Sequence, residues 1–139
     1  MTAQGLLVCG TASNAGKTTV VAGLCRALAR RGVRVAPFKA QNMSLNSGVT
    51  MSGHEIARAQ LLQSDAARTP AEAAMNPILV KPGSDRHAHL IVNGIPAGEI
   101  DATDYVGDRS ALRRIAAEAY RDLAARYDVV VAEGAGSAA

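Results

Sequence analysis

Apolar positions divide the first forty residues into a strand, a helix and a second strand. Residues 5–10 (GLLVCG) form a short, nearly continuous apolar run, which is typical of a buried central strand in a parallel sheet. In residues 18–31 the apolar side chains recur at helical spacing, and Gly32 supplies a stop signal after them. Residues 33–38 (VRVAPF) predict the second strand. Such a unit forms a right-handed crossover in nearly every known case.

The pattern changes after this unit. Residues 39–53 are polar and lack periodicity, which predicts a long ordered loop, and long loops in compact domains are usually functional. Residues 54–68 are Ala-rich and predict a weakly amphipathic helix. Residues 77–81 (PILVK) and 89–93 (HLIVN) predict two strands, separated by the turn-forming residues 82–85.

The last third of the chain predicts one more helix and one more strand. Leu112, Ile115, Ala119 and Leu123 belong to an apolar stripe at helical spacing, with charged residues largely on the opposite face. Residues 128–132 (DVVVA) then predict a buried parallel strand. The predicted fold class is therefore a three-layer α/β domain with a mainly parallel sheet.

Composition agrees with one compact domain. The chain has 139 residues, of which 48% are hydrophobic and 19% charged, so disorder and tandem domains are excluded. Aromatic residues make up only 3%, which leaves the core to Ala, Val, Leu and Ile. No run approaches the roughly 18 apolar residues of a membrane span, and the N-terminus lacks the layout of a signal peptide. We expect a cytoplasmic protein without a membrane partner.

Charge and cysteine content narrow the function classes further. The net charge of +3 comes from scattered basic residues without interleaved aromatics, so no nucleic-acid partner is predicted. Cys9 and Cys25 lie in apolar periodic segments without metal-ligand spacing, which predicts two buried thiols. The oligomeric state stays open, a homo-oligomer included.

Residues 10–19 (GTASNAGKTT) predict a phosphate-binding loop between the first strand and the first helix. Small residues let successive backbone N–H groups converge on phosphate oxygens, and the helix N-terminus adds its dipole. Lys17 is expected to reach the β- and γ-phosphates of ATP, and Thr18 to offer its hydroxyl to Mg²⁺. The expected nucleotide-binding residues are Thr11, Ser13, Asn14, Ala15, Gly16, Lys17, Thr18 and Thr19.

This loop departs from the strict motif, because Thr11 holds the position of its first glycine. The alternative interpretation is a glycine-rich turn with a solvent-exposed lysine. A second signal favours the phosphate site: residues 133–137 (EGAGS) follow a Val-rich strand, at the sheet edge where ligands bind in such folds. Glu133 is therefore a candidate Mg²⁺ ligand, the alternative being a carboxylate that caps the next segment.

Together these motifs resemble the dethiobiotin synthetase-like group of P-loop enzymes. The stretches 37–47 (PFKAQNMSLNS), 55–60 (EIARAQ) and 75–82 (MNPILVKP) are similar, more specifically, to the cobyric acid synthase family. The resemblance runs over essentially the whole chain. It implies ATP-dependent amidation of carboxylates on a corrinoid, adenosylcobyrinic acid a,c-diamide, through an acyl phosphate that ammonia from glutamine attacks.

The resemblance also implies roles for individual residues. Lys17 and Lys39 become catalytic residues at the transferring phosphoryl group. Thr18, Glu55 and Glu133 form the implied Mg²⁺ set, although Glu55 has an alternative as a surface partner of Arg58. The implied corrinoid-binding residues are Gln41, Asn42, Ser44, Asn46 and Lys81. The alternatives are an internally bonded loop for the first four and a strand-end cap for Lys81.

One departure concerns the source of ammonia. The family carries a glutaminase domain with a catalytic cysteine, and neither Cys9 nor Cys25 has the setting that such a nucleophile needs. Residues 1–139 are therefore expected to be part of a dethiobiotin synthetase-like ATP-binding domain, with glutamine-derived ammonia supplied by a glutaminase domain outside this sequence.

Three other functions remain open. A partitioning-type ATPase switch would carry a lysine early in the loop, where Ala12 and Ser13 stand, and an aspartate where Lys39 stands. A dethiobiotin synthetase-like ligase fits the loop but not the stretch 39–47. A non-catalytic nucleotide-binding module differs from the enzyme only in lacking turnover.

Overall fold

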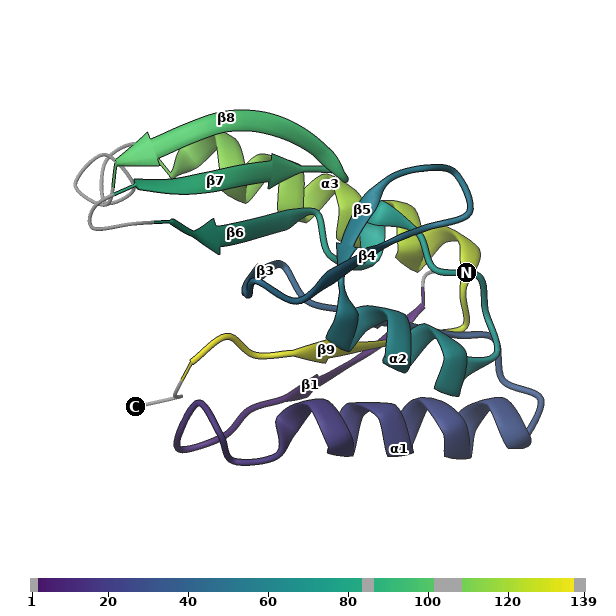
Figure 1. Cartoon of the computed structure of the whole chain (residues 1–139). Coiled ribbons are helices and arrows are strands. Elements are labelled where there is room, and N and C mark those ends of the chain that lie inside the picture. Colours follow the sequence, from purple (N-terminus) through teal and green to yellow (C-terminus); the bar gives the residue numbers. More distant parts are fainter. Residues whose placement is uncertain (1–2, 84–86, 102–108, 137–139) are drawn as a thin grey trace.

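The computed structural model describes residues 3–83, 87–101 and 109–136 (Figure 1). A parallel sheet of three strands positions the predicted loop: β1 (Gln4–Val8), β9 (Val129–Glu133) and β2 (Val35–Phe38), in that order. Val8 is in register with Glu133, and Phe38 with Ala132, so the three strands end at one edge. The residues that follow these strands therefore meet there.

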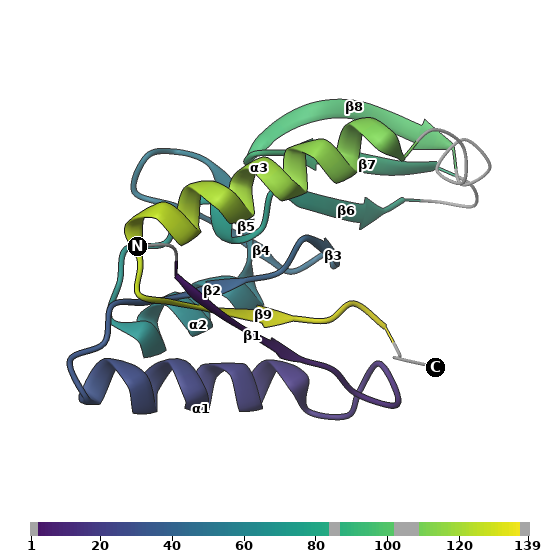
Figure 2. The same ribbon diagram turned by 180° about the vertical axis from the view of Figure 1, so that it is seen from behind.

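Helices cover both faces of this sheet (Figure 2). α1 (Lys17–Arg30) and α2 (Arg58–Ala67) lie on one face, and α3 (Ser110–Arg126) lies on the other. Side chains alternate along β9, so Val131 packs with Val21 and Cys25 of α1, whereas Val130 packs with Leu123 of α3. The predicted three-layer α/β fold is confirmed.

The remaining strands form two smaller sheets. In the first, β3 (Gln41–Met43) runs parallel to β6 (Ile78–Pro82), and β7 (His87–Val92) and β8 (Ile95–Asp101) follow antiparallel. In the second, β4 (Ser47–Val49) pairs with β5 (Glu55–Ala57). A 3-10 helix, η1 (Ala73–Met75), precedes β6. The expected strand pair around residues 82–85 is confirmed, although residues 84–86 lie outside the described ranges.

The predicted position of the first strand was wrong. β1 lies at the end of the sheet, and its Leu7 is 63% exposed. The central place belongs to β9, whose consecutive valines suit burial on both faces. Cys9 follows the end of β1 and is exposed, which corrects the expectation of two buried thiols. Cys25 is buried, and burial raises the pKa of its thiol to about 12.

Two segment predictions also need correction. The predicted loop 39–53 contains the short strands β3 and β4. The helix predicted from residue 54 begins only at Arg58, because Glu55–Ala57 pair with Ser47–Val49 as a strand. β8 was not predicted.

None of the helices in the described ranges is both long and apolar enough to cross a membrane.

Candidate functional site

The loop between β1 and α1 has the backbone features of an anion site. Gly16 caps α1 with φ 86°, a left-handed conformation that glycine adopts without strain. No side chain caps this helix end, and the first intrahelical bond runs from the Val20 N–H to the Gly16 carbonyl oxygen, at 3.1 Å. The N–H groups of the first turn are thus free of intrahelical partners, and the helix dipole favours an anion beside them.

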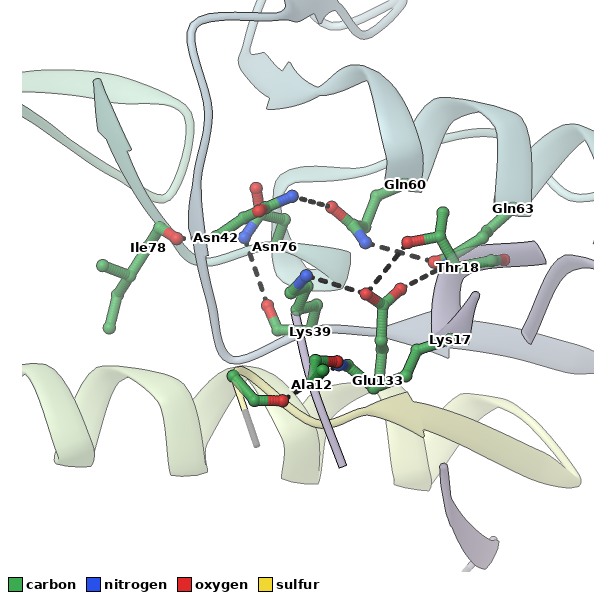
Figure 3. Close-up of polar contacts among 11 residues, drawn as sticks. Ala12, Lys17, Thr18, Lys39, Asn42, Gln60, Gln63, Asn76, Ile78 and Glu133 are labelled. Atoms are coloured by element: carbon green, nitrogen blue, oxygen red, sulfur yellow. Dashed lines mark hydrogen bonds and ion pairs between the residues drawn. The ribbon is translucent and has the colours of Figure 1, made fainter. Parts of the chain in front are cut away.

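Lys17 lies inside the loop rather than in solvent. The residue is 5% exposed, and its Nζ donates to the carbonyl oxygens of Ala12, at 2.8 Å, and Gly136, at 2.9 Å (Figure 3). A Cβ added at Gly10 would lie 3.1 Å from Lys17 Cγ, so the absence of a side chain there leaves room for the lysine stem. The alternative of a turn with a solvent-exposed lysine is excluded.

Glu133 collects donors from three other elements (Figure 3). It ends β9 on the same side as Val131 and is 5% exposed. Its Oε1 accepts from Thr18 Oγ1 of α1, at 3.0 Å, and from Lys39 Nζ after β2, at 2.8 Å. Its Oε2 accepts from Gln63 Nε2 of α2, at 2.7 Å. The alternative role of Glu133 as a cap of the next segment is therefore not what the structure shows.

Lys39 is held in place by its backbone. Its N–H donates to the Met75 carbonyl oxygen, at 2.8 Å, and its own carbonyl oxygen accepts from Asn76 Nδ2, at 3.2 Å. Asn76 is 1% exposed and also donates to the Ile78 carbonyl oxygen, at 3.0 Å. The turn from η1 into β6 thus fixes the point from which the Lys39 side chain reaches Glu133.

The donors around Glu133 are compatible with Mg²⁺. This ion prefers hard oxygen ligands and is commonly held by one or two carboxylates together with substrate phosphates and water. The Thr18 hydroxyl and the Glu133 carboxylate are such ligands, and they meet beside the N-terminus of α1. No group of three or more His, Cys, Asp or Glu side chains suited to a metal occurs within the described ranges.

Glu55 does not join this pair. Its carboxylate forms an ion pair with Lys81 and accepts from Ser47 Oγ, at 2.5 Å. Partial burial acts to raise the pKa of Glu55, but the hydrogen bonds from Lys81 and Ser47 outweigh it and lower the pKa below its ordinary value. The expected Mg²⁺ set is thus brought together only as Thr18 and Glu133. Lys81 and Glu55 pair with each other, an arrangement that the sequence did not predict for either.

The expected corrinoid-binding residues are largely bonded within the protein. Asn42 is buried and donates to Gln60 Oε1, at 3.0 Å. The Ser44 hydroxyl accepts from the Asn46 N–H, at 3.0 Å. Gln41 lines a cavity of about 180 Å³ together with Leu112 and Arg113 of α3. The contacts of Asn42 and Ser44 agree with the alternative of an internally bonded loop, in which Asn46 takes part through its backbone.

Sequence reasoning missed the amides that support the site, Gln60, Gln63 and Asn76. Gln60, Gln63, Ser64 and Ala67 are the buried residues of α2 and share one face at helical spacing. The weak amphipathicity of residues 54–68 was the available signal, because polar side chains on the buried face lower the contrast between the two faces.

Comparison with known proteins shows the family to which this domain belongs. Residues 6–133 match the family described as "CobQ/CobB/MinD/ParA nucleotide binding domain". The chain is 60% identical over 137 residues to a protein of Mycolicibacterium gilvum (strain PYR-GCK) named cobyric acid synthase, and 61% identical over 140 residues to one of the same name from Mycobacterium tuberculosis (strain ATCC 25618 / H37Rv). These matches cover 96% and 98% of this chain, but the chain spans only 28% of the length of either relative.

Proposed function

Because the chain belongs to the family of CobQ/CobB/MinD/ParA nucleotide-binding domains, we propose that it binds Mg²⁺ and ATP and phosphorylates a carboxylate of a corrinoid for amidation. The cobyric acid synthases to which it is similar support this choice within the family. The observation that carries the proposal is the meeting of Thr18, Lys39 and Glu133 at the N-terminus of α1.

The nucleotide part of the proposal assigns a role to each group at this sheet edge. The N–H groups at the start of α1 receive the phosphates, and Lys17 leaves its carbonyl partners to meet the β- and γ-phosphates. Thr18 and Glu133 would hold Mg²⁺, which would neutralise phosphate charge when bound. Lys39 stands beside them at the end of β2.

The transfer joins two anions, and this is why a second lysine matters. A substrate carboxylate oxygen attacks the γ-phosphorus, the bond to the β,γ-bridging oxygen breaks, and ADP leaves. Ammonia then attacks the acyl phosphate carbon, loses a proton and expels inorganic phosphate, which leaves an amide. Lys39 lowers the repulsion between the carboxylate and the phosphoryl group by lying between them.

The test is direct amidation. The chain is incubated with ATP, Mg²⁺, adenosylcobyrinic acid a,c-diamide and ammonium chloride, and products are followed by mass spectrometry. We expect conversion of carboxyl to amide groups with ammonium, at a trace rate, and none with glutamine as the only nitrogen source. Nucleotide binding without any amide or acyl phosphate would leave a nucleotide-binding module and contradict the proposed transfer.

A further inference from the structure

Three amide side chains connect β3 to the carboxylate of Glu133 through the protein interior (Figure 3). Asn42 Nδ2 donates to Gln60 Oε1, at 3.0 Å, and Gln60 Nε2 donates to Gln63 Oε1, at 3.2 Å. Gln63 Nε2 donates in turn to Glu133 Oε2, at 2.7 Å. Gln60 and Gln63 are both 0% exposed. We call Asn42, Gln60 and Gln63 the amide relay.

The charge of Glu133 sets the direction of this relay. An amide has one donor end and one acceptor end, and its partners decide which way it points. The Glu133 carboxylate, paired with Lys39, has only acceptor oxygens, and the Thr18 carbonyl oxygen lies on the same side, 3.4 Å from Gln63 Nε2. Gln63 must therefore turn its oxygen toward Gln60, and Gln60 must turn its oxygen toward Asn42.

At the outer end, the relay leaves an acceptor. Asn42 uses its amino group for Gln60, and its Oδ1 takes no hydrogen bond from a described residue. Asn42 keeps 9% of its surface exposed, and Oδ1 is the end of its amide that does not bond Gln60. This oxygen lies on β3, three positions beyond Lys39 in the chain.

We propose that Asn42 is a specificity-determining residue that accepts a hydrogen bond from a primary amide of the substrate, with Gln60 and Gln63 as positioning residues that impose its orientation from Glu133. The inference rests on the proposed function, since a partly amidated corrinoid carries both amides and carboxylates. These two groups have nearly the same shape. Only the amide donates to Asn42 Oδ1, whereas a carboxylate would place oxygen against oxygen.

The relay itself is tested without any ligand. In Asn42→Asp both ends of the relay are acceptors, so one hydrogen bond must fail, and we expect the melting temperature to fall by roughly 5–10 °C. Adding Glu133→Gln lets every amide reverse, because the new amide donates to Gln63 while its oxygen keeps Thr18 and Lys39. The double variant should therefore melt higher than the two separate shifts predict.

Electrostatic repulsion between Glu133 and the new carboxylate of Asn42→Asp would also make Glu133→Gln restore stability. The hydrogen bonds of the relay must therefore be removed in a separate test. Gln63→Met and, independently, Gln60→Met keep the length of the side chain and remove its hydrogen bonds. In either of these variants that folds, the melting-temperature shifts of Asn42→Asp and Glu133→Gln should become additive. Compensation of unchanged size would overturn the relay. The side-chain amide resonances of Asn42 give a second measurement: Glu133→Gln must shift them, and must not do so once the relay is cut.

The specificity is tested with two corrinoids in the absence of nucleotide. Cobyrinic acid a,c-diamide and cobyrinic acid, which has only carboxyl groups at the same positions, are compared by equilibrium dialysis with corrinoid absorbance as the readout. We expect the wild-type chain to bind the diamide about 10-fold more tightly. Glu133→Gln should abolish or reverse that preference. Equal binding of both corrinoids by the wild type would overturn the role of Asn42. Binding of neither would overturn the proposed function with it, while the melting experiment still decides whether the relay exists.

Discussion

Lys39 and Glu133 form a buried ion pair, with 2.8 Å between Nζ and Oε1, although 94 positions separate them in the chain. They meet because β2 and β9 are neighbours in the sheet and end at the same edge. The pair neutralises, within the protein, the cation proposed for phosphoryl transfer and the carboxylate proposed for Mg²⁺. A metal ion that takes Glu133 would compete with Lys39 for the same oxygen, and so would make the lysine available.

Replacing Lys39 should affect both stability and rate. Lys39→Ala leaves the Glu133 carboxylate with Thr18 and Gln63 alone, and breaking a buried pair costs about 3 kcal/mol of unfolding free energy. If Lys39 acts on the transferring phosphoryl group, the amidation rate should fall by orders of magnitude while ATP affinity changes little. Calorimetry and the amidation assay measure the two effects. A variant with normal rate and lost ATP affinity would reverse this assignment.

Lys17 should matter for nucleotide affinity. Hydrogen bonds to charged groups contribute about 1.5–3 kcal/mol, so Lys17→Ala should weaken ATP binding roughly 10- to 100-fold. Arg26→Ala, which removes an exposed cation from the same helix, is the matched control and should bind as the wild type does. Equal affinities of all three proteins in calorimetry would refute the phosphate-loop assignment.

Glu133→Gln separates metal binding from nucleotide binding. The substitution keeps the size of the side chain and an oxygen for Thr18 and Lys39, but removes the negative charge. ATP affinity should therefore fall in the presence of Mg²⁺ and change much less in its absence. The two affinities are measured with Mg²⁺ and with a chelator. Equal losses under both conditions would show a role of Glu133 in the fold rather than in the metal site.

The ion pair of Lys81 and Glu55 predicts a pH-dependent difference in stability. Because the pKa of Glu55 is lowered in the folded protein, the pair stabilises the fold above the ordinary glutamate value of about 4.3 and loses this effect as the pH falls through the lower folded value. Lys81→Met should cost at most about 1 kcal/mol at neutral pH and nothing in strong acid. Urea unfolding at both pH values measures this, with Arg58→Met as a control whose effect should not depend on pH in this way.

The two cysteines should differ in reactivity. Cys9 is exposed, whereas Cys25 is 0% exposed and the pKa of its thiol is raised to about 12. A thiol reagent such as Ellman's reagent should modify one cysteine quickly in the folded protein and the second only after denaturation. Cys9→Ser should remove the fast phase, and a fast phase that survives in this variant would contradict the assignment.

Local patterns predicted the parts of the fold that depend on local chemistry. The helical stripe through Leu112 and Leu123 and Gly32 with φ 78° after α1 are found as expected. The Val-rich strand predicted over 128–132 is found one residue later, as Val129–Glu133. The order of the strands was not predictable in this way. An apolar run such as residues 5–10 suits an edge strand as well as a central one, and only the insertion of β9 between β1 and β2 decides which it is.

In the site, too, the features set by local sequence were predictable and those set by long-range packing were not. The placement of Thr18, Lys39 and Glu133 at one sheet edge follows from their positions at the ends of predicted elements. The pairing of Glu55 with Lys81 depends on β5 and β6, and β5 was predicted as the start of a helix. The hydrogen bonds of Gln63 depend on the packing of α2 against α1 and β2, which no spacing within the helix reveals.

The two carbonyl oxygens that hold Lys17 have a consequence for the timing of events. The Lys17 amine bonds Ala12 within its own loop and Gly136 in the turn after β9, which lies 119 positions from the lysine. The lysine thus links these two segments. A phosphate that binds the Lys17 amine displaces both carbonyl oxygens from it, so the lysine exchanges hydrogen-bond partners when the phosphate binds. The lysine is already ordered before the exchange, which spares the roughly 1.5–2 kcal/mol of side-chain entropy that a free lysine would lose. Phosphate binding in the loop therefore also changes the turn after β9, because the carbonyl oxygen of Gly136 loses its hydrogen-bond donor.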